Sequence, residues 1–395
     1  ESISPTDSLA LVIMTRPYMS FLSSIVGHSA ERVALSDQKG LHTYGEIVLR
    51  ARHLAATFKD HGLMAEEPVA YLADKSAHAV VAMLGIWFAG AIAVPLSLQC
   101  TTDSILNQLK TLGCRFAVLP YPPVDEALVR DTFSQLQWLS AEQKHSKPAP
   151  LKVSNNNPNA LIAFTAVTSL PIIITFSALA ARAKILAQTW SLMPGDLVFH
   201  LLPMASARGV VGVLSSMVAG GICRLQPHHQ SLNDALANEP SELILLDAVD
   251  YGQFIEVLEP SSGSMLHKRH ATLVIVSTAL TIDCLKDHWC QLPGITQQWV
   301  YSLPEGGILL SMDISRHYPS SFTGHPLTGV NVRIVDADGK ASDSERGFLE
   351  VRSPQLFTTY FHQGEATTRT LNHGWLKTHL SCEINAAGDV VIPIP

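Results

Sequence analysis

Residues 77–96 read AHAVVAMLGIWFAGAIAVPL, and this stretch decides the fold class of the chain. Ser76 is a favoured helix N-cap, and it precedes an apolar helical run that Gly90 closes. The short apolar run at residues 93–96 follows at once and predicts a buried strand. A helix that leads directly into a buried strand is typical of βαβ units, in which helices connect parallel strands.

The sequence on both sides repeats this alternation. Thr43 and Glu46 have the spacing of a capping box for a helix over residues 44–58, and residues 69–72 predict the next strand. Further helices are predicted at residues 104–112, 177–190 and 210–218. Further strands are predicted at residues 116–119, 160–164, 197–202, 221–225, 243–246 and 272–277. We therefore predict an α/β protein with mostly parallel sheets.

Two changes of composition suggest domain boundaries. Residues 120–158 are rich in proline and polar side chains, contain one helical stretch at residues 125–136, and end in an Asn-rich loop. From about residue 311 the helical patterns give way to short alternating runs with turn signals such as Asp338-Gly339. We predict two βαβ-type layered subdomains, at residues 1–157 and 158–310, and a small β-rich subdomain at residues 311–395.

Composition excludes several classes of protein. The chain has 395 residues, of which 47% are hydrophobic and 15% charged, against a usual charged share of about 25%. It can bury a large core, and its low charge also suits surfaces buried against partners. The net charge of -7 and the lack of a basic block disfavour nucleic-acid binding. No apolar run is long enough to predict a transmembrane helix.

The cysteines and histidines do not predict a metal site. The 6 cysteines are spread without a CxxC pair, which favours reduced thiols in an intracellular protein over a disulfide framework. The pair His228-His229 has no cysteine or carboxylate at metal-ligand spacing, and we interpret it as part of a surface loop.

Residues 164–174, FTAVTSLPIII, stand where a nucleotide-binding enzyme would carry a phosphate loop, between a polar linker and a predicted helix. Such a loop uses glycines so that backbone N–H groups approach the phosphates, and usually a lysine that balances their charge. This stretch has threonine and serine but neither glycine nor lysine. A loop so rich in isoleucine is expected to pack inside the protein.

Several motifs occur in the order typical of one family. Among them are ERVALSDQKGLHTYGEI (residues 31–47), GHPLTGVNVRIVD (324–336), GFLEVRSPQLFTTYF (347–361) and EATTRTLNHGWLKT (365–378). Together they resemble the large N-terminal domain of the acyl-CoA synthetases, the adenylate-forming acid–CoA ligases. The resemblance is nearest to the malonyl-CoA synthetase branch, which is mitochondrial. It implies the large-domain fold of adenylate-forming enzymes, with a β-barrel-like C-terminal subdomain.

The resemblance also implies a nucleotide site. Members of the family join a carboxylate to ATP and then pass the acyl group to CoA. Their phosphate loop aligns with Thr165, Thr168 and Ser169, while Ile172 stands at the lysine position. Tyr301 matches the residue that lies along adenine, and Glu305 matches the magnesium-binding glutamate.

Other chemical positions of the family are altered. Pro304 replaces the threonine that contacts the α-phosphate, and Leu380 replaces the ribose-binding aspartate. The acyl-pocket motif, residues 202–209, has small residues where the family has histidine or an aromatic residue. The catalytic C-terminal domain is expected to be absent. The site formed by Thr165, Thr168, Ser169, Tyr301 and Glu305 is therefore interpreted as vestigial.

From these losses we predict a catalytically inactive pseudoenzyme with no catalytic residues, no metal and no cofactor. It would serve as a structural or accessory subunit among the other protein subunits of a larger complex, in a mitochondrial assembly on the matrix side. One alternative is an active acyl-CoA or malonyl-CoA synthetase that uses ATP, Mg and CoA. Another is a non-catalytic sensor that binds an acyl chain or CoA in the cleft near residues 205–208. Whether a small-molecule ligand binds is left open.

Overall fold

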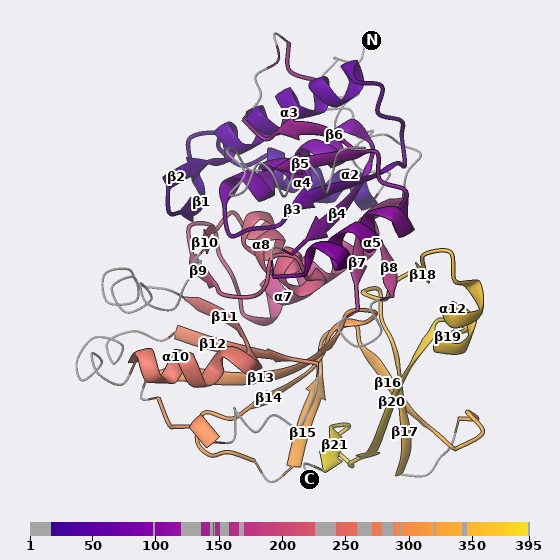
Figure 1. Cartoon of the computed structure of the whole chain (residues 1–395). Coiled ribbons are helices and arrows are strands. Elements are labelled where there is room, and N and C mark those ends of the chain that lie inside the picture. The colour runs from indigo at the N-terminus through magenta and orange to yellow at the C-terminus, as the bar shows by residue number, and fades with distance from the viewer. Residues whose placement is uncertain are drawn as a thin grey trace, which may run out of the picture. The chain divides into compact units, whose positions relative to one another are not determined.

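The computed structural model of the chain divides into two compact units (Figure 1). It describes residues 17–97, 99–119, 136–142, 145, 147–150, 158–165, 170–225, 242–258, 271–278, 287–292, 294–319, 321–341 and 346–393. Unit 1 comprises Glu1–Ala163, Ile173–Ala180 and Met204–Ser206, and unit 2 comprises Phe164–Ile172, Ala181–Pro203 and Ala207–Pro395. The three-part division at residues 157 and 310 stays a prediction, since this two-way division neither requires nor excludes it.

Unit 1 is built on a parallel sheet. Its strands lie in the order β7-β4-β3-β5-β6, and register pairs such as Val69 with Ala93 and Val69 with Phe116 run parallel. The strands are β3 (Pro68–Leu72), β4 (Ile92–Leu96), β5 (Phe116–Leu119), β6 (Gln137–Ser140) and β7 (Asn159–Phe164). Apart from the end strand β6 and the two ends of β7, nearly all of their side chains are buried, as parallel sheets covered on both faces require.

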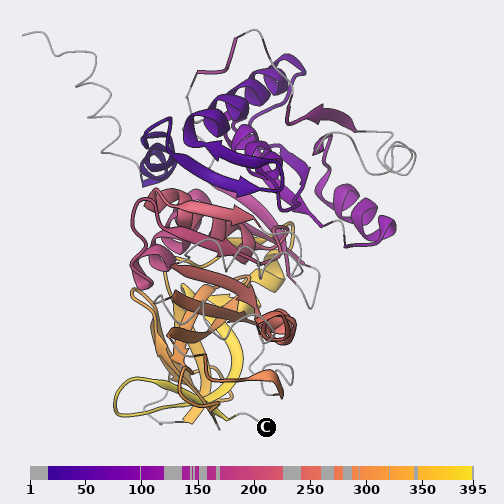
Figure 2. The ribbon, with the colours of Figure 1, turned by 90° about the vertical axis from the view of Figure 1, so that its left-hand side faces the viewer.

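Helices α3 (Tyr44–Asp60), α4 (Ala77–Ala89) and α5 (Thr102–Leu112) of unit 1 lie within two residues of their predicted bounds, whereas α2 (Pro17–Val26) was not predicted. Helices α3 and α4 pack together (Figure 2). Thr43 and Glu46 form the predicted capping box of α3, Ser76 caps α4, and Gly90 ends α4 at a φ of 86°. Before α3, the hairpin of β1 (Val33–Asp37) and β2 (Gly40–Thr43) is antiparallel.

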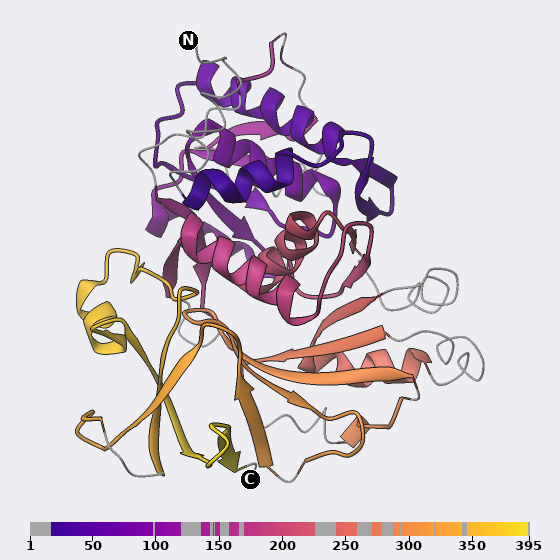
Figure 3. The ribbon, with the colours of Figure 1, turned by 180° about the vertical axis from the view of Figure 1, so that it is seen from behind.

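Unit 2 contains a second sheet that changes from parallel to antiparallel. In its first part, β9 (Leu197–His200), β10 (Ile222–Leu225), β11 (Leu243–Asp247), β12 (Ala271–Ser277) and β13 (Ile295–Leu303) pair in parallel. Helices α8 (Ala207–Ala219), η2 (Ala248–Asp250) and α10 (Tyr251–Leu258) lie in unit 2, whereas α7 (Phe176–Thr189) is divided between the two units after Ala180. Strand β14 (Gly307–Asp313) then folds back antiparallel to β13, and the two run side by side (Figure 3).

The C-terminal part of unit 2 is β-rich, as predicted. Its elements are β15 (Ser321–Pro326), β16 (Asn331–Val335), β17 (Arg346–Arg352), β18 (Thr359–Tyr360), α12 (Gly364–Thr370), β19 (Leu371–Asn372), β20 (Trp375–Ile384) and β21 (Val390–Pro393). The pairs β16–β17, β17–β20, β20–β21 and β15–β21 are all antiparallel. Strands β13, β14 and β20 were not predicted, because their polar and apolar residues do not alternate regularly.

Two further expectations can be compared with the structure. The large apolar side chains of Phe21, Leu22 and Phe254 are buried within the chain, in line with the expected large core. Among the described helices, none is long and apolar enough to span a membrane. The predicted helix at residues 125–136 and the pair His228-His229 fall outside the described residues, except for Leu136.

Candidate nucleotide site around Glu305

The structure places three of the five predicted site residues in unit 2. Thr165 directly follows β7, Tyr301 lies in β13, and Glu305 lies in the turn between β13 and β14. Thr168 and Ser169 lie outside the described residues.

Thr165 closes the loop that occupies the phosphate-loop position. Its N–H donates to the Leu170 carbonyl at 3.0 Å, and its Oγ1 accepts from the Leu170 N–H at 3.0 Å. Strand β8 (Pro171–Thr175) begins at the next residue, and Ile172 and Ile174 in it are fully buried. The prediction that the isoleucine run packs inside is confirmed. Its strand was missed, because we interpreted the run only as a loop.

Glu305 is held at its backbone and at its side chain. Its carbonyl accepts from the Phe357 N–H at 2.7 Å and from Nη2 of Arg182 at 3.2 Å. Its Oε1 accepts from the Tyr360 hydroxyl at 2.8 Å. Among the described residues, Oε2 has no hydrogen-bond partner. One carboxylate oxygen is thus oriented by the protein.

Arg182 is a buried cation beside this turn. It projects from α7 with an exposed fraction of 2%, and its Nε donates to the Gln355 carbonyl at 2.8 Å. Burial lowers the pKa of Arg182 to about 9, although the nearby charge of Glu305 raises it. The guanidinium therefore remains charged at pH 7, where it binds two backbone carbonyls and attracts Glu305.

Gln355 and Gly307 also fix the conformation of the turn between β13 and β14. Nε2 of Gln355 donates to the Ile308 carbonyl at 2.8 Å. Gly307 has a φ of +75°, and a Cβ at this position would lie 2.7 Å from Oε1 of Gln355. Only glycine satisfies both conditions, because other residues are strained at this φ and their Cβ would overlap the amide.

Two tyrosines face the charge of Glu305. Burial and the carboxylate of Glu305 raise the pKa of Tyr301 and of Tyr360, so both hydroxyls are neutral at physiological pH. The N–H of Phe361, next to Tyr360, donates to the Pro171 carbonyl at 2.8 Å. This bond connects the Tyr360 segment to the end of the loop that Thr165 closes. The structure thus links Thr165, Tyr301 and Glu305 through one set of neighbouring residues.

Sequence reasoning missed Arg182, Gln355 and Tyr360 as supporting residues. Tyr360 lies within the matched motif FTTYF, where it was interpreted only as part of the framework. Arg182 had a weak signal, an arginine on the apolar face of a predicted helix. Gln355 had no signal in the sequence, because its role depends on hydrogen bonds to residues that are distant in the sequence, Arg182 and Ile308.

The altered positions also have defined places. Pro304 lies in the same turn as Glu305, and the N–H of Leu380 in β20 donates to Oγ1 of Thr378 at 3.3 Å. Arg208 of the acyl-pocket motif lies in α8 and forms an ion pair with Asp247. Its buried Nε has no hydrogen-bond partner within the described ranges.

Comparisons with known proteins agree with this geometry. Residues 23–361 match the family model described as AMP-binding enzyme. The mitochondrial malonate–CoA ligases of Mus musculus and Homo sapiens are each 25% identical to the chain, and the alignments cover 88% of this chain and 68% and 70% of the relatives. The structure of apo MatB from Rhodopseudomonas palustris matches with a TM-score of 0.79 at 20% identity, covering 94% of this chain and 77% of that one. The predicted fold, the large α/β domain of adenylate-forming enzymes, is confirmed.

The relatives contradict the prediction of a catalytically inactive pseudoenzyme acting as an accessory subunit. They are named as malonate–CoA ligases, which are enzymes. The prediction was wrong because it equated substituted side chains with lost chemistry. Phosphate loops bind largely through backbone N–H groups, which every residue except proline supplies, and a single lost side-chain contact costs about 1–3 kcal/mol.

Proposed function

Because the chain belongs to the AMP-binding enzyme family, we propose that it is an acid–CoA ligase that forms an acyl-adenylate from ATP and then an acyl-CoA. Its supporting observation is the anchored carboxylate of Glu305, together with relatives named for malonate–CoA ligation that align with 88% of the chain. We propose malonate as the acid to test first.

The Glu305 carboxylate suits the magnesium ion that accompanies ATP. Magnesium in phosphoryl sites takes one or two carboxylates and otherwise binds phosphates and water. No group of three or more metal-ligating side chains occurs in the described part of the chain, and Glu305 would supply a carboxylate ligand. Magnesium, when bound, neutralises charge on the phosphates. Tyr360 holds the carboxylate in one orientation, and Arg182 and Phe357 hold the backbone that carries it.

The substitutions at the phosphate-loop position predict weak binding of ATP. Ile172 is buried in β8 and cannot supply the positive charge that a lysine would bring to the phosphates. Loss of one charge-assisted hydrogen bond costs about 1.5–3 kcal/mol. We therefore expect a high KM for ATP and binding that depends mainly on the magnesium complex.

Arg208 favours a dicarboxylic acid. It belongs to the segment that resembles the acyl pocket, and its side chain is 22% exposed beside Asp247. Because the side chain is partly exposed, the guanidinium can accommodate a second carboxylate as well as Asp247. A guanidinium binds planar carboxylates through paired N–H donors, so the distal carboxylate of malonate would bind more strongly than the methyl group of propionate.

The experiment is ATP–pyrophosphate exchange with malonate, methylmalonate, propionate and acetate, followed by detection of the CoA thioester. We expect the rate of pyrophosphate exchange to be higher with malonate than with propionate. We also expect the rate with malonate to fall in Glu305→Gln. The control is Glu365→Gln, the same change at an exposed glutamate of α12. Absence of exchange with every acid, together with no calorimetric binding of Mg·ATP, would overturn the proposal.

We propose that the protein acts in the mitochondrial matrix. The support is that the mouse and human relatives are named as mitochondrial. Protease protection of the full-length protein in intact and swollen mitochondria would check this, since protection lost on swelling alone would place it outside the matrix. Association with other protein subunits stays a prediction, which its native size in solution would check.

A further inference from the structure

Unit 1 carries a polar pocket that the proposed reaction does not use. Its volume is about 380 Å³, and it lies where the β1–β2 hairpin, α3, α4 and the segment after β6 meet. Its lining residues are Lys39, His42, Leu49, Arg50, His53, His78, Ala141 and Glu142. None of them is among the residues described above around Glu305.

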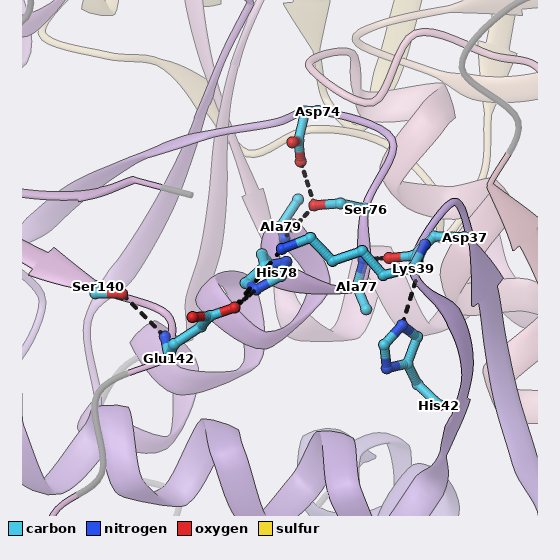
Figure 4. Close-up of polar contacts among 10 residues, drawn as sticks. All are labelled: Asp37, Lys39, His42, Asp74, Ser76, Ala77, His78, Ala79, Ser140 and Glu142. Carbon is cyan, nitrogen blue, oxygen red and sulfur yellow. Dashed lines mark hydrogen bonds and ion pairs between the residues drawn. The ribbon is translucent and has the colours of Figure 1, made fainter. Parts of the chain in front are cut away.

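The acidic groups around this pocket are already engaged by donors (Figure 4). Asp37 accepts from the N–H groups of Ala77 and Lys39, each at 2.8 Å, and from Nε2 of His42 at 3.0 Å. Glu142 accepts from Nε2 of His78 at 2.6 Å. These carboxylates are therefore held by hydrogen bonds from their own partners.

Several basic groups of the pocket are not engaged in the same way. The guanidinium of Arg50 is half-buried and, within the described ranges, makes no hydrogen bond; Glu142, Asp37 and Glu46 act on it only through their charge. His53 lies three residues further along α3, and its buried Nδ1 has no hydrogen-bond partner among the residues that the structure describes. The ammonium of Lys39 lies 3.7 Å from Glu142 and is 57% exposed.

Donors that are buried without a partner are costly, because they lose hydration and gain nothing in return. Arg50 and His53 lie on one face of α3, and of the two only Nδ1 of His53 is buried without a partner within the described residues, while Lys39 approaches from the β1–β2 turn. An anion in the pocket would accept hydrogen bonds from all three.

We propose that this pocket binds a small anion that carries a phosphate group, either free phosphate or a phosphate monoester. Donors from three side chains suit a tetrahedral group with at least three terminal oxygens better than a carboxylate, which presents two oxygens in one plane. Leu49 and Ala141 add an apolar wall, against which the organic part of a monoester would pack. The proposal is independent of the ligase activity, because the two sites share no residue.

The test is calorimetric titration of the full chain, at low salt, with inorganic phosphate, phenyl phosphate and benzoate. We expect phenyl phosphate to bind, benzoate to bind at least tenfold more weakly, and Arg50→Gln to reduce phosphate affinity about tenfold or more. Lys59→Gln is the matched control, since Lys59 is an exposed cation of the same helix outside the pocket. A higher affinity for phenyl phosphate than for inorganic phosphate would identify a monoester as the ligand. A higher affinity for inorganic phosphate would identify free phosphate.

His53→Gln provides a second variant if Arg50→Gln lowers the thermal midpoint. It should also reduce affinity for phenyl phosphate while leaving the fold unchanged by circular dichroism. Failure of every phosphate to bind would overturn the proposal. So would unchanged affinity in folded Arg50→Gln or His53→Gln, or binding of benzoate as tight as that of phenyl phosphate.

Discussion

The hydroxyl of Tyr360 donates a 2.8 Å hydrogen bond to Oε1 of Glu305, which joins residues that are 55 positions apart in the sequence. The bond ties the turn between β13 and β14 to the short strand β18. It orients the carboxylate, and Oε2 has no partner in the described part of the chain.

Replacing Tyr360 with phenylalanine removes this bond and leaves the ring in place. The Glu305 carboxylate then loses its orientation, and we expect the KM for Mg·ATP in pyrophosphate exchange to rise about tenfold, as for one hydrogen bond to a charged group. Tyr318→Phe is the control, since Tyr318 stacks on Trp299. Equal effects of the two changes would contradict the assignment.

Replacing Arg182 with methionine leaves the carbonyls of Glu305 and Gln355 without their buried donor. We expect the free energy of unfolding to fall by about 2–4 kcal/mol in urea titrations. Lys184→Met, an exposed position of the same helix, should change it by less than about 0.5 kcal/mol. An unchanged free energy of unfolding in Arg182→Met would mean that the two carbonyls find other hydrogen-bond donors.

Gly307→Ala places a Cβ against Oε1 of Gln355 in a backbone with positive φ. Gly339 has nearly the same φ, +77°, but nothing lies within 4 Å of its Cβ position. Gly339→Ala therefore measures the backbone strain alone, about 1 kcal/mol. We expect Gly307→Ala to cost at least about 1 kcal/mol more in thermal or urea unfolding, and to raise the KM for Mg·ATP. An equal loss of unfolding free energy in Gly307→Ala and Gly339→Ala would show that the side-chain amide of Gln355 moves away from the new Cβ without cost.

Asp37 predicts a pH dependence of stability. Burial alone would raise its pKa, but its hydrogen bonds from Ala77, His42 and Lys39 outweigh burial and lower the pKa below 3.8. A carboxyl with a lowered folded pKa stabilises the protein above its unfolded pKa, and this stabilisation is lost as the pH falls through the folded pKa. We expect Asp37→Asn to reduce the free energy of unfolding at pH 7.

The difference between wild type and Asp37→Asn should shrink below about pH 3.8, the ordinary pKa of an aspartate. Urea unfolding between pH 3 and 7 would measure it. Asp103→Asn, at an exposed aspartate in the first turn of α5, should show a much smaller change. A difference that stays constant over this pH range would contradict the role of the Asp37 charge.

Ile172→Lys restores the residue type that the family carries in its phosphate loop, yet the position is fully buried in β8. An unpaired buried ammonium loses several kcal/mol of hydration. We expect a loss of at least about 3 kcal/mol in unfolding free energy and no gain in ATP affinity. Ile173→Lys, at the half-buried neighbour, should cost less. A lowered KM for ATP in Ile172→Lys would show that the strand can release this side chain.

The boundaries of α3 and α4 could be predicted because their signals are local. Thr43, Glu46, Ser76 and Gly90 act on backbone groups within one helical turn. The parallel strands β3, β4, β5 and β7 of unit 1 were predicted for a similar reason, since each is a short apolar run, whereas β6, with the sequence QWLS, was missed. The site was predicted only in part: the motifs identified Tyr301 and Glu305, but nothing near them in sequence pointed to Gln355 or to the pocket between Arg50 and Glu142.

The sequence by itself determined the fold class, the helix ends and the family of this protein, because apolar periodicity, caps and turn residues act over a few neighbouring positions. Only the tertiary structure decided which oxygen of Glu305 is held, which glycine is obligatory, and that the basic groups of Lys39, Arg50 and His53 line one pocket. Those features depend on hydrogen bonds and burial between residues that are tens to more than a hundred positions apart, such as Arg182 and Gln355. Contacts of that range form only when the strands and helices pack.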